Sequence, residues 1–154
     1  MDDNNMSIEE LFSLMGKQES RFAGMYRDMA ARFRLSESEM WIYYFLLMQP
    51  SGLTQQDICS QMSIKKQTVN SAVAKLVMEE MVTLAPVSEG SKSKILSLTT
   101  KGREFAECTV GRMLKAELRA AQKFGIRKLE RLCKLQEEYF LTLRKELGIL
   151  NIKH

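Results

Sequence analysis

The chain has 154 residues, of which 45% are hydrophobic and 27% are charged, and its formal net charge at pH 7 is +4. This composition is that of a globular protein large enough for one core, and no window reaches the ~18 consecutive apolar residues of a membrane span. The three cysteines are far apart without CxxC spacing and the only histidine is His154, so neither a disulfide framework nor a metal site is predicted.

The first five residues, MDDNN, are acidic and lack the basic and apolar regions of a secretion signal, so we expect a cytoplasmic location. The scattered carboxylates and the terminal histidine do not combine into a base, nucleophile or metal constellation. We therefore expect no enzymatic activity and no cofactor.

Two capping boxes predict the starts of the first two helices. Residues 7–10 read SIEE and residues 36–39 read SESE, in which a serine hydroxyl and a glutamate carboxylate satisfy each other's end-of-helix N–H groups. We expect helices over residues 8–32 and from residue 37 onward. Because residues 40–48 are nearly all apolar, the second helix is predicted to be central to the core.

A second pair of helices follows the Pro50-Ser51-Gly52 turn. Thr54 is expected to cap a short helix over residues 55–61, and a further helix is expected over residues 65–80. The predicted buried stripe of this later helix comprises Val69, Ala72, Val73, Leu76 and Glu80 or Met81. Its opposite face carries Lys66, Gln67, Asn70, Ser71, Ala74 and Lys75.

Two strands and the C-terminal helices complete the pattern. Residues 82–86 and 95–99 are β-branched or apolar, and residues 88–94, SEGSKSK, have the composition of a hairpin tip. We then expect one helix from residue 99 or 100 to about 123 and another over residues 126–147. The predicted fold is mainly α with a small β-hairpin wing, namely a winged helix-turn-helix.

The helix over residues 65–80 carries the side chains that a DNA-reading helix needs. The DNA major groove admits one α-helix, whose exposed residues must offer donors and acceptors to base edges without bulk. Lys66, Gln67, Asn70 and Ser71 meet that requirement. Lys65 and Thr68 are placed for phosphates, and Lys75 on the exposed face is a further candidate DNA contact. Lys92 and Lys94 are expected to give the wing a second contact. A solvated helix face and an ordinary charged hairpin are the alternatives.

Three segments of the sequence resemble the MarR-type regulators. The family pattern has a Gln- or Glu-rich short helix, a "Lys-x-Thr-Val-x-x-x-Val-x-x-Leu" recognition helix and a wing that closes in "Leu-Thr-x-Lys-Gly". Here these segments read TQQDI at residues 54–58, KQTVNSAVAKL at residues 66–76 and LTTKG at residues 98–102. The order and spacing of the three segments carry the resemblance, which covers about residues 8–147.

The resemblance implies one MarR-like domain over residues 1–154. Its DNA-binding part spans residues 35–103, and residues 8–33 and 104–148 form dimerisation helices. The implied protein is a homodimeric, sequence-specific transcriptional regulator, a repressor that binds an inverted-repeat operator in double-stranded DNA. The terminal helices also carry more apolar surface than a lone winged helix could cover, which agrees with a dimer. The alternative is a winged-helix protein-interaction module without operator-specific DNA binding.

The resemblance also implies that a small aromatic or phenolic effector releases the protein from DNA. The candidate pocket residues are Phe12, Phe22, Met25, Trp41 and Tyr44, with Met15 and Met48 as further candidates. Aromatic and methionine stripes at helical spacing are more often core residues than ligand contacts, and that reading stays open.

The sequence departs from the family pattern at three places. Residues 90–92, GSK, replace the usual Asp-x-Arg of the wing, so we expect a more mobile wing. Met81 replaces the glycine usual after the recognition helix, so a different turn is expected there. Lys65 stands where the family often has a capping serine, so the helix is expected to start on Ser63 or on the backbone alone.

Overall fold

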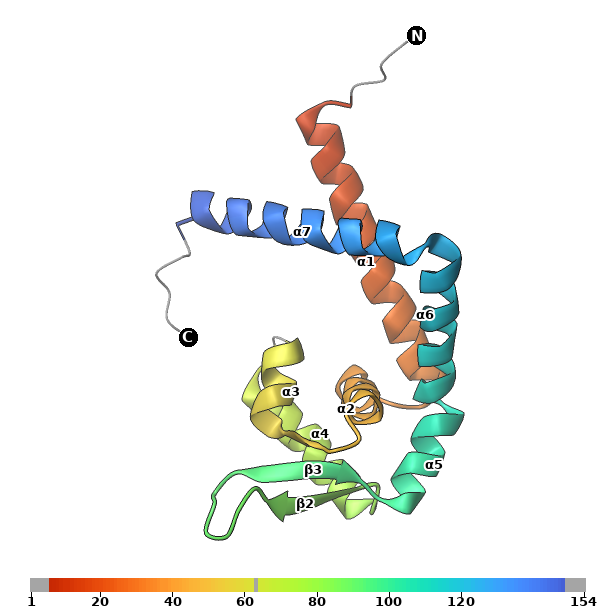
Figure 1. Ribbon diagram of the computed structural model, residues 1–154, viewed down its shortest axis with the longest axis vertical. Coiled ribbons are helices and arrows are strands. Elements are labelled where there is room, and N and C mark those ends of the chain that lie inside the picture. Colours follow the sequence, from red (N-terminus) through yellow and green to blue (C-terminus); the bar gives the residue numbers. More distant parts are fainter. Residues whose placement is uncertain (1–5, 63, 149–154) are drawn as a thin grey trace. The chain divides into compact units, whose positions relative to one another are not determined.

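The computed structural model describes residues 6–62 and 64–148, in which the chain is mainly α-helical with a small antiparallel sheet (Figure 1). This confirms the predicted fold class. The elements in chain order are α1 (Ile8–Arg32), α2 (Glu37–Met48), β1 (Leu53–Thr54), α3 (Gln55–Met62), α4 (Lys66–Met78), β2 (Val82–Pro86), β3 (Lys94–Leu98), α5 (Thr100–Cys108), α6 (Val110–Phe124) and α7 (Ile126–Glu146).

The two predicted capping boxes are present. The Ser7 N–H donates to the Glu10 carboxylate at 2.8 Å, and the Ser36 N–H donates to the Glu39 carboxylate at 2.7 Å. In both boxes the serine hydroxyl accepts the glutamate N–H in return. Helices α1 and α2 therefore begin at the predicted residues, because these local bonds satisfy the N–H groups that no helical turn can reach.

The sheet has three strands in the order β1-β3-β2, all antiparallel. Strand β2 pairs with β3 from Val82 opposite Leu98 to Pro86 opposite Lys94, as predicted apart from one residue at the ends of β3. The two-residue strand β1 was not predicted, because a strand this short shows no alternation in sequence. Strand β3 ends at Leu98 because Thr99 caps helix α5.

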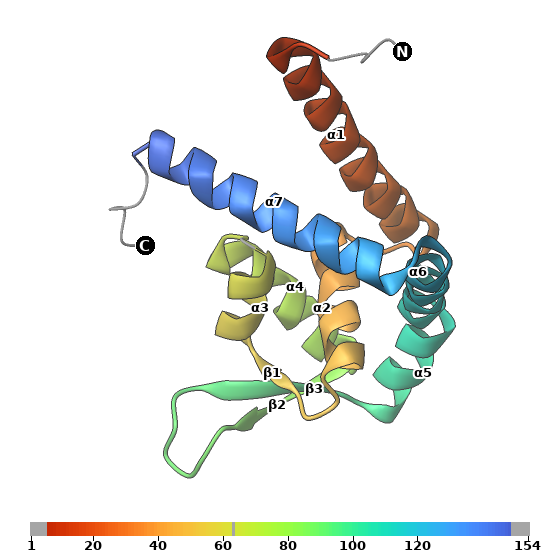
Figure 2. The same cartoon turned by 45° about the horizontal axis from the view of Figure 1, so that its top comes forward.

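Helices α2, α3 and α4 cover one side of the sheet, and the core lies between these helices and the sheet (Figures 1 and 2). Helix α2 contributes Met40, Ile42, Tyr43 and Leu46, each at most 1% exposed, which confirms its central place. Most of α1 extends away from this core, and only Ala30 in it is buried. The hairpin loop between β2 and β3 projects beyond the helices.

The end of α4 corrects one prediction. The helix ends at Met78, two residues before the predicted end at residue 80, and the residue in the left-handed region is Glu80, with φ +59°. The Met81 N–H donates to the Leu76 carbonyl at 2.8 Å and the Glu80 N–H donates to the Val77 carbonyl at 3.0 Å, which is a Schellman ending. The buried stripe therefore stops at Leu76, and the exposed Glu80 supplies the turn that the family assigns to glycine.

The first C-terminal helix was predicted as one continuous element and is two. Helix α5 stops at Thr109, whose backbone angles are φ −115° and ψ −89°, and α6 starts at Val110. The Thr109 hydroxyl donates to the Phe105 carbonyl at 2.7 Å, and such a bond to the preceding turn bends helices. The prediction was wrong here because apolar spacing continues across the bend.

The chain divides into two compact units, residues 1–113 and 114–154. The first turn of α6 is buried in the first unit through Val110 and Met113, whereas no residue over 114–148 is buried. Large apolar side chains on the second unit are exposed, including Leu118, Phe124, Leu132, Leu135, Phe140 and Leu147. The predicted single-domain organisation stays a prediction. Within the described ranges, none of the helices has the length and apolar character of a membrane span.

Replacing Gly102 by alanine tests the packing at the start of α5. An added Cβ would lie 1.8 Å from the Met81 carbonyl oxygen, so the backbone must shift, and we expect a loss of ~2–3 kcal/mol in unfolding free energy. Gly16→Ala in α1 is the control, because its Cβ would meet nothing within 4 Å and helix propensity favours it by up to ~1 kcal/mol. Urea unfolding followed by circular dichroism measures both, and equal stability of the two variants would contradict the packing described here.

Candidate nucleic-acid interface

Helix α4 separates a buried stripe from an exposed polar face, as the sequence predicts. Val69, Ala72, Val73 and Leu76 are buried, all but Ala72 at most 1% exposed. The residues predicted to contact DNA from this helix are all exposed; they are Lys65, Lys66, Gln67, Thr68, Asn70, Ser71 and Lys75. Because the apolar stripe fixes which face is turned inward, the polar face is turned outward.

The start of α4 relies on the backbone. Lys65 occupies the N-cap position without a side-chain capping bond, and its carbonyl accepts the N–H groups of Thr68 and Val69 at 3.0 and 3.3 Å. This fits the expectation of a backbone start, while Ser63, the other candidate, lies outside the described residues. A helix N-terminus without a side-chain cap presents N–H groups and the positive end of the helix dipole, which suits a phosphate.

The wing and α4 face the same depression, here called the wing-side hollow. Its volume is about 490 Å³. It is lined by Thr54, Gln55, Gln56, Lys66, Asn70, Leu84, Lys92, Ser93 and Lys94. Three lysines from two separate elements thus meet with polar side chains, and no acidic residue is among the lining residues. The structure therefore brings together Lys66, Asn70, Lys92 and Lys94, as the sequence predicts, in surroundings that favour a polyanion.

The other flank of α4 faces the start of α2 across a second depression, here called the α2-side hollow. Its volume is about 540 Å³, and it is lined by Ser36, Ser38, Glu39, Gln67, Thr68, Ser71, Ala72 and Lys75. The Ser71 hydroxyl donates to the Gln67 carbonyl at 3.0 Å. Its oxygen can still accept a hydrogen bond, so Ser71 keeps part of its predicted capacity to contact a base.

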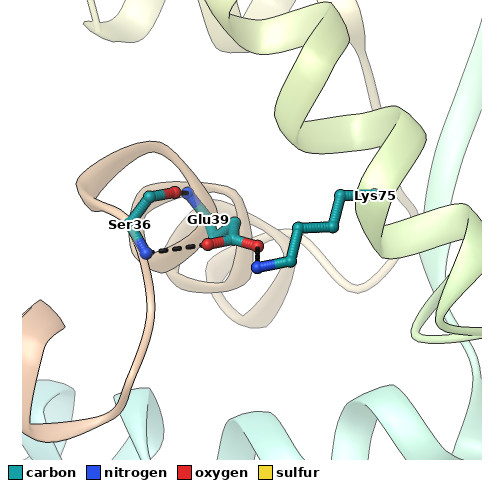
Figure 3. Close-up of polar contacts among 3 residues, drawn as sticks. All are labelled: Ser36, Glu39 and Lys75. Atoms are coloured by element: carbon teal, nitrogen blue, oxygen red, sulfur yellow. Dashed lines mark hydrogen bonds and ion pairs between the residues drawn. The ribbon is translucent and has the colours of Figure 1, made fainter.

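Lys75 of α4 forms an ion pair with Glu39 of α2, a contact that was not predicted from the sequence. The Lys75 Nζ lies 2.5 Å from the Glu39 Oε1, and the second carboxylate oxygen of Glu39 accepts the Ser36 N–H (Figure 3). Burial by itself raises the pKa of the Glu39 carboxyl, but the hydrogen bonds from Lys75 and Ser36 outweigh it and hold the pKa below its usual value. The hydrogen bond with Glu39 raises the pKa of Lys75.

The wing tip is closed by short-range hydrogen bonds. The Val87 N–H donates to the Ser93 carbonyl and the Ser91 N–H donates to the Ser88 carbonyl, each at 3.0 Å. Gly90 takes a positive φ of +76° at the turn, a conformation that glycine adopts without steric cost. The greater mobility expected for this wing stays a prediction.

The start of α5 holds the end of α4. The Thr99 hydroxyl donates to the Glu80 carbonyl at 2.7 Å and accepts the Gly102 N–H at 2.9 Å. The Lys101 Nζ donates to the Glu79 carbonyl at 2.9 Å. The LTTKG segment therefore fixes the turn through which α4 enters the wing, and Gly102 permits the close approach to Met81.

The predicted effector residues fall into two groups. Trp41 and Tyr44 lie together, with ring centroids 5.3 Å apart, and Trp41 also contacts Tyr26 and Phe45 at 4.9 and 6.0 Å. The remaining candidates are exposed side chains outside this aromatic cluster; they are Phe12, Met15, Phe22, Met25 and Met48. Neither of the two hollows is lined by any of these residues, so the pocket stays a prediction.

The cysteines are free thiols. Cys59 is half-buried, whereas Cys108 and Cys133 are exposed. Over residues 6–62 and 64–148, His, Cys, Asp and Glu side chains form no group of three or more that could hold a metal ion.

Several solved structures have a fold similar to that of this chain. NMB1585, a MarR family regulator from Neisseria meningitidis, superimposes with a TM-score of 0.76 at 17% sequence identity, covering 90% of this chain and 96% of that chain. This is the MarR-family fold. The MarR-like fold also appears in the S. aureus MepR–DNA complex, with a TM-score of 0.61, 16% identity and coverage of 90% and 99%. NadR in complex with 4-hydroxyphenylacetate gives a TM-score of 0.66 at 18% identity, with coverage of 90% and 96%.

The resemblance inferred from the three sequence segments is thereby confirmed at the level of the fold. No protein-family model matches the chain, and no curated protein matches it significantly. In the MarR-like fold α4 is the second helix of the helix-turn-helix and the β2–β3 hairpin is the wing, in the order that the sequence predicts.

Proposed function

We propose that this chain is a sequence-specific DNA-binding transcriptional regulator, a dimeric cytoplasmic repressor without catalytic activity. The carrying observation is the wing-side hollow, where Lys66 and Asn70 of α4 meet Lys92 and Lys94 of the wing. Asparagine and glutamine can hydrogen-bond adenine in two places, and lysine can donate to guanine or to phosphate. The MarR-like fold supports the proposal, since MepR, which has a similar fold, was solved in a complex with DNA.

Exposed apolar side chains support the homodimer. Helix α1 leaves Phe12, Phe22 and Met25 between 55% and 60% exposed, and α7 leaves Leu135 and Phe140 more than half exposed. Large apolar side chains that lie exposed along one helix mark surfaces that pair with another chain. In the proposed dimer these helices cover one another and hold two copies of α4 at successive turns of an inverted-repeat operator.

A small phenolic effector completes the proposal. NadR has the same fold and binds 4-hydroxyphenylacetate, a small phenolic acid. The aromatic cluster of Trp41 and Tyr44 lies on α2, which also packs against α4. An effector that bound beside this cluster and fitted one arrangement of α2 better than another would shift the protein away from its DNA-bound state.

Selection from a random pool of duplex DNA tests the proposed function. The retained duplexes are sequenced after binding in ~0.15 M salt, where phosphate contacts alone give weak affinity. We expect enrichment of an inverted repeat with half-sites ~10 base pairs apart. Retention without an enriched sequence would contradict operator recognition and would favour a protein-interaction module.

Two kinds of alanine variant separate base contacts from phosphate contacts. Gln67→Ala and Asn70→Ala should each cost ~1–3 kcal/mol of operator binding and relax sequence preference. Lys94→Ala should weaken all duplexes alike and reduce the slope of log affinity against log salt by ~1. Lys17→Ala on α1 removes the same charge from an exposed site and is the control. Fluorescence anisotropy at several salt concentrations measures these effects, and equal losses on all sequences for every variant would disprove the assigned roles.

Sedimentation velocity tests the dimer. We expect a mass twice the 17.7 kDa of one chain. Leu135→Glu should release monomers, because it places a charge on the exposed apolar side of α7, whereas Glu137→Gln, on roughly the opposite side of the helix, should remain dimeric. A wild-type mass of one chain would contradict the proposed dimer.

A further inference from the structure

Glu39 is the one charged residue that is buried in the described part of the chain. Its exposed fraction is 2%, and it lies in the first turn of α2, where it contacts Lys75 of α4. A carboxylate in such a place loses the hydration it has in water and therefore requires compensating partners. Two groups supply that compensation, the Ser36 N–H and the Lys75 ammonium.

The chain itself offers a comparison, because the same capping box occurs twice. In both boxes one glutamate oxygen accepts the N–H of the capping serine. Glu10 in the first box is exposed, so water can hydrate its carboxylate. Glu39 in the second box is buried and makes an ion pair with Lys75 of another helix. Helix capping therefore accounts for one oxygen of Glu39, and only the contact with α4 accounts for the other.

Lys75 lies on the same side of α4 as the proposed base-reading residues. It is one helical turn beyond Ser71 and two beyond Gln67, and all three line the α2-side hollow. The Lys75 side chain is 48% exposed, and its ammonium lies against the Glu39 carboxylate in the first turn of α2 (Figure 3). The end of α4 beyond Lys75 is held by Thr99 and Lys101, whereas its start has no side-chain cap.

We propose that Lys75 and Glu39 are positioning residues that set the rotation of α4 relative to α2, so that Gln67 and Asn70 point at the bases. The inference rests on the proposed DNA-binding function and replaces the direct DNA contact predicted for Lys75. A buried, hydrogen-bonded carboxylate permits one geometry, whereas the apolar stripe of α4 would tolerate small rotations. The apolar stripe turns the polar face of α4 outward, and the Lys75–Glu39 pair then sets the direction in which the side chains of that face point.

The two roles of Lys75 give opposite results when Glu39 is replaced. If Lys75 contacts phosphate, Glu39→Gln frees its ammonium, and affinity for DNA holds or rises. If the pair positions α4, Glu39→Gln weakens operator binding as much as Lys75→Met does. The glutamine still accepts the Ser36 N–H, so the cap of α2 is retained and the ion pair is lost.

Operator binding by Glu39→Gln, Lys75→Met and the double variant is the deciding measurement. We expect each single variant to lose about tenfold in operator affinity. The double variant should bind the operator no more weakly than whichever single variant binds it more weakly. The slope of log affinity against log salt should stay as in the wild type. Glu10→Gln removes the same charge from the exposed capping box and is the control. Unchanged affinity in Glu39→Gln, with a flatter salt slope in Lys75→Met, would overturn the proposal in favour of a phosphate contact. Lower melting temperatures with unchanged affinity would overturn it in favour of a merely structural pair.

A measurement without DNA distinguishes failure of this inference from failure of the proposed function. We expect the backbone amide signals of Gln67 and Asn70 in ¹H–¹⁵N spectra to move in both single variants and to stay in Glu10→Gln. If they stay in all variants, the pair does not position α4, whether or not the protein binds an operator. If they move while the wild type selects no operator, the pair orients α4 and the DNA-binding function is the part that fails.

The ionisation of Glu39 gives a second readout of the pair. In Lys75→Met the burial of Glu39 remains and its counter-charge is lost, so the pKa of the Glu39 carboxyl should rise relative to the wild type. The other titratable groups around the pair are Glu79, the C-cap of α4, whose charge raises the pKa of Lys75, and Tyr43 on α2, whose pKa is raised by burial and by the charges of Glu79 and Glu39. A ¹³C carboxyl titration measures this pKa, and an unchanged value in Lys75→Met would overturn the pairing.

Discussion

Helix α4 must bury one face and keep the opposite face exposed to solvent, and the first unit is arranged around that requirement. Its buried stripe packs into the core with α2 and the sheet, and each fully buried Val69, Val73 or Leu76 stabilises the fold by ~1.5–3 kcal/mol. The ion pair between Lys75 and the buried Glu39 must first offset the cost of removing a carboxylate from water, so its net contribution to stability is small. Apolar burial therefore decides that α4 packs against α2, and the polar contacts adjust its orientation in that packing.

The polar contacts of α4 differ along its length. At its start the backbone alone makes the first turn, which leaves N–H groups available to a phosphate. In its third turn Lys75 meets the buried Glu39, and at its end Thr99 and Lys101 bind the last carbonyls. A helix held in this way is open where DNA would approach and fixed where it turns into the wing. That arrangement suits a reader whose accuracy depends on side-chain direction.

The charges around α4 also differ between its two sides. The wing-side hollow gathers Lys66, Lys92 and Lys94 and has no acidic residue among its lining residues, whereas the α2-side hollow contains Glu39 and the lysine that neutralises it. A polyanion is therefore attracted mainly to the wing side of α4. In the proposed complex the wing lysines supply affinity without sequence preference, and Gln67 and Asn70 supply the preference.

The sequence by itself determined the helices, the hairpin and the polar face of α4, because these depend on contacts between residues close together in the chain. Capping boxes set the starts of α1 and α2, and apolar spacing set the buried stripe of α4. Tertiary structure decided what depends on contacts between distant segments. It paired Lys75 with Glu39 and broke the predicted helix at Thr109, and the left-handed turn after α4 fell on Glu80. Spacing along one helix shows which face a side chain occupies, but the partner it meets there depends on how another helix packs against that face.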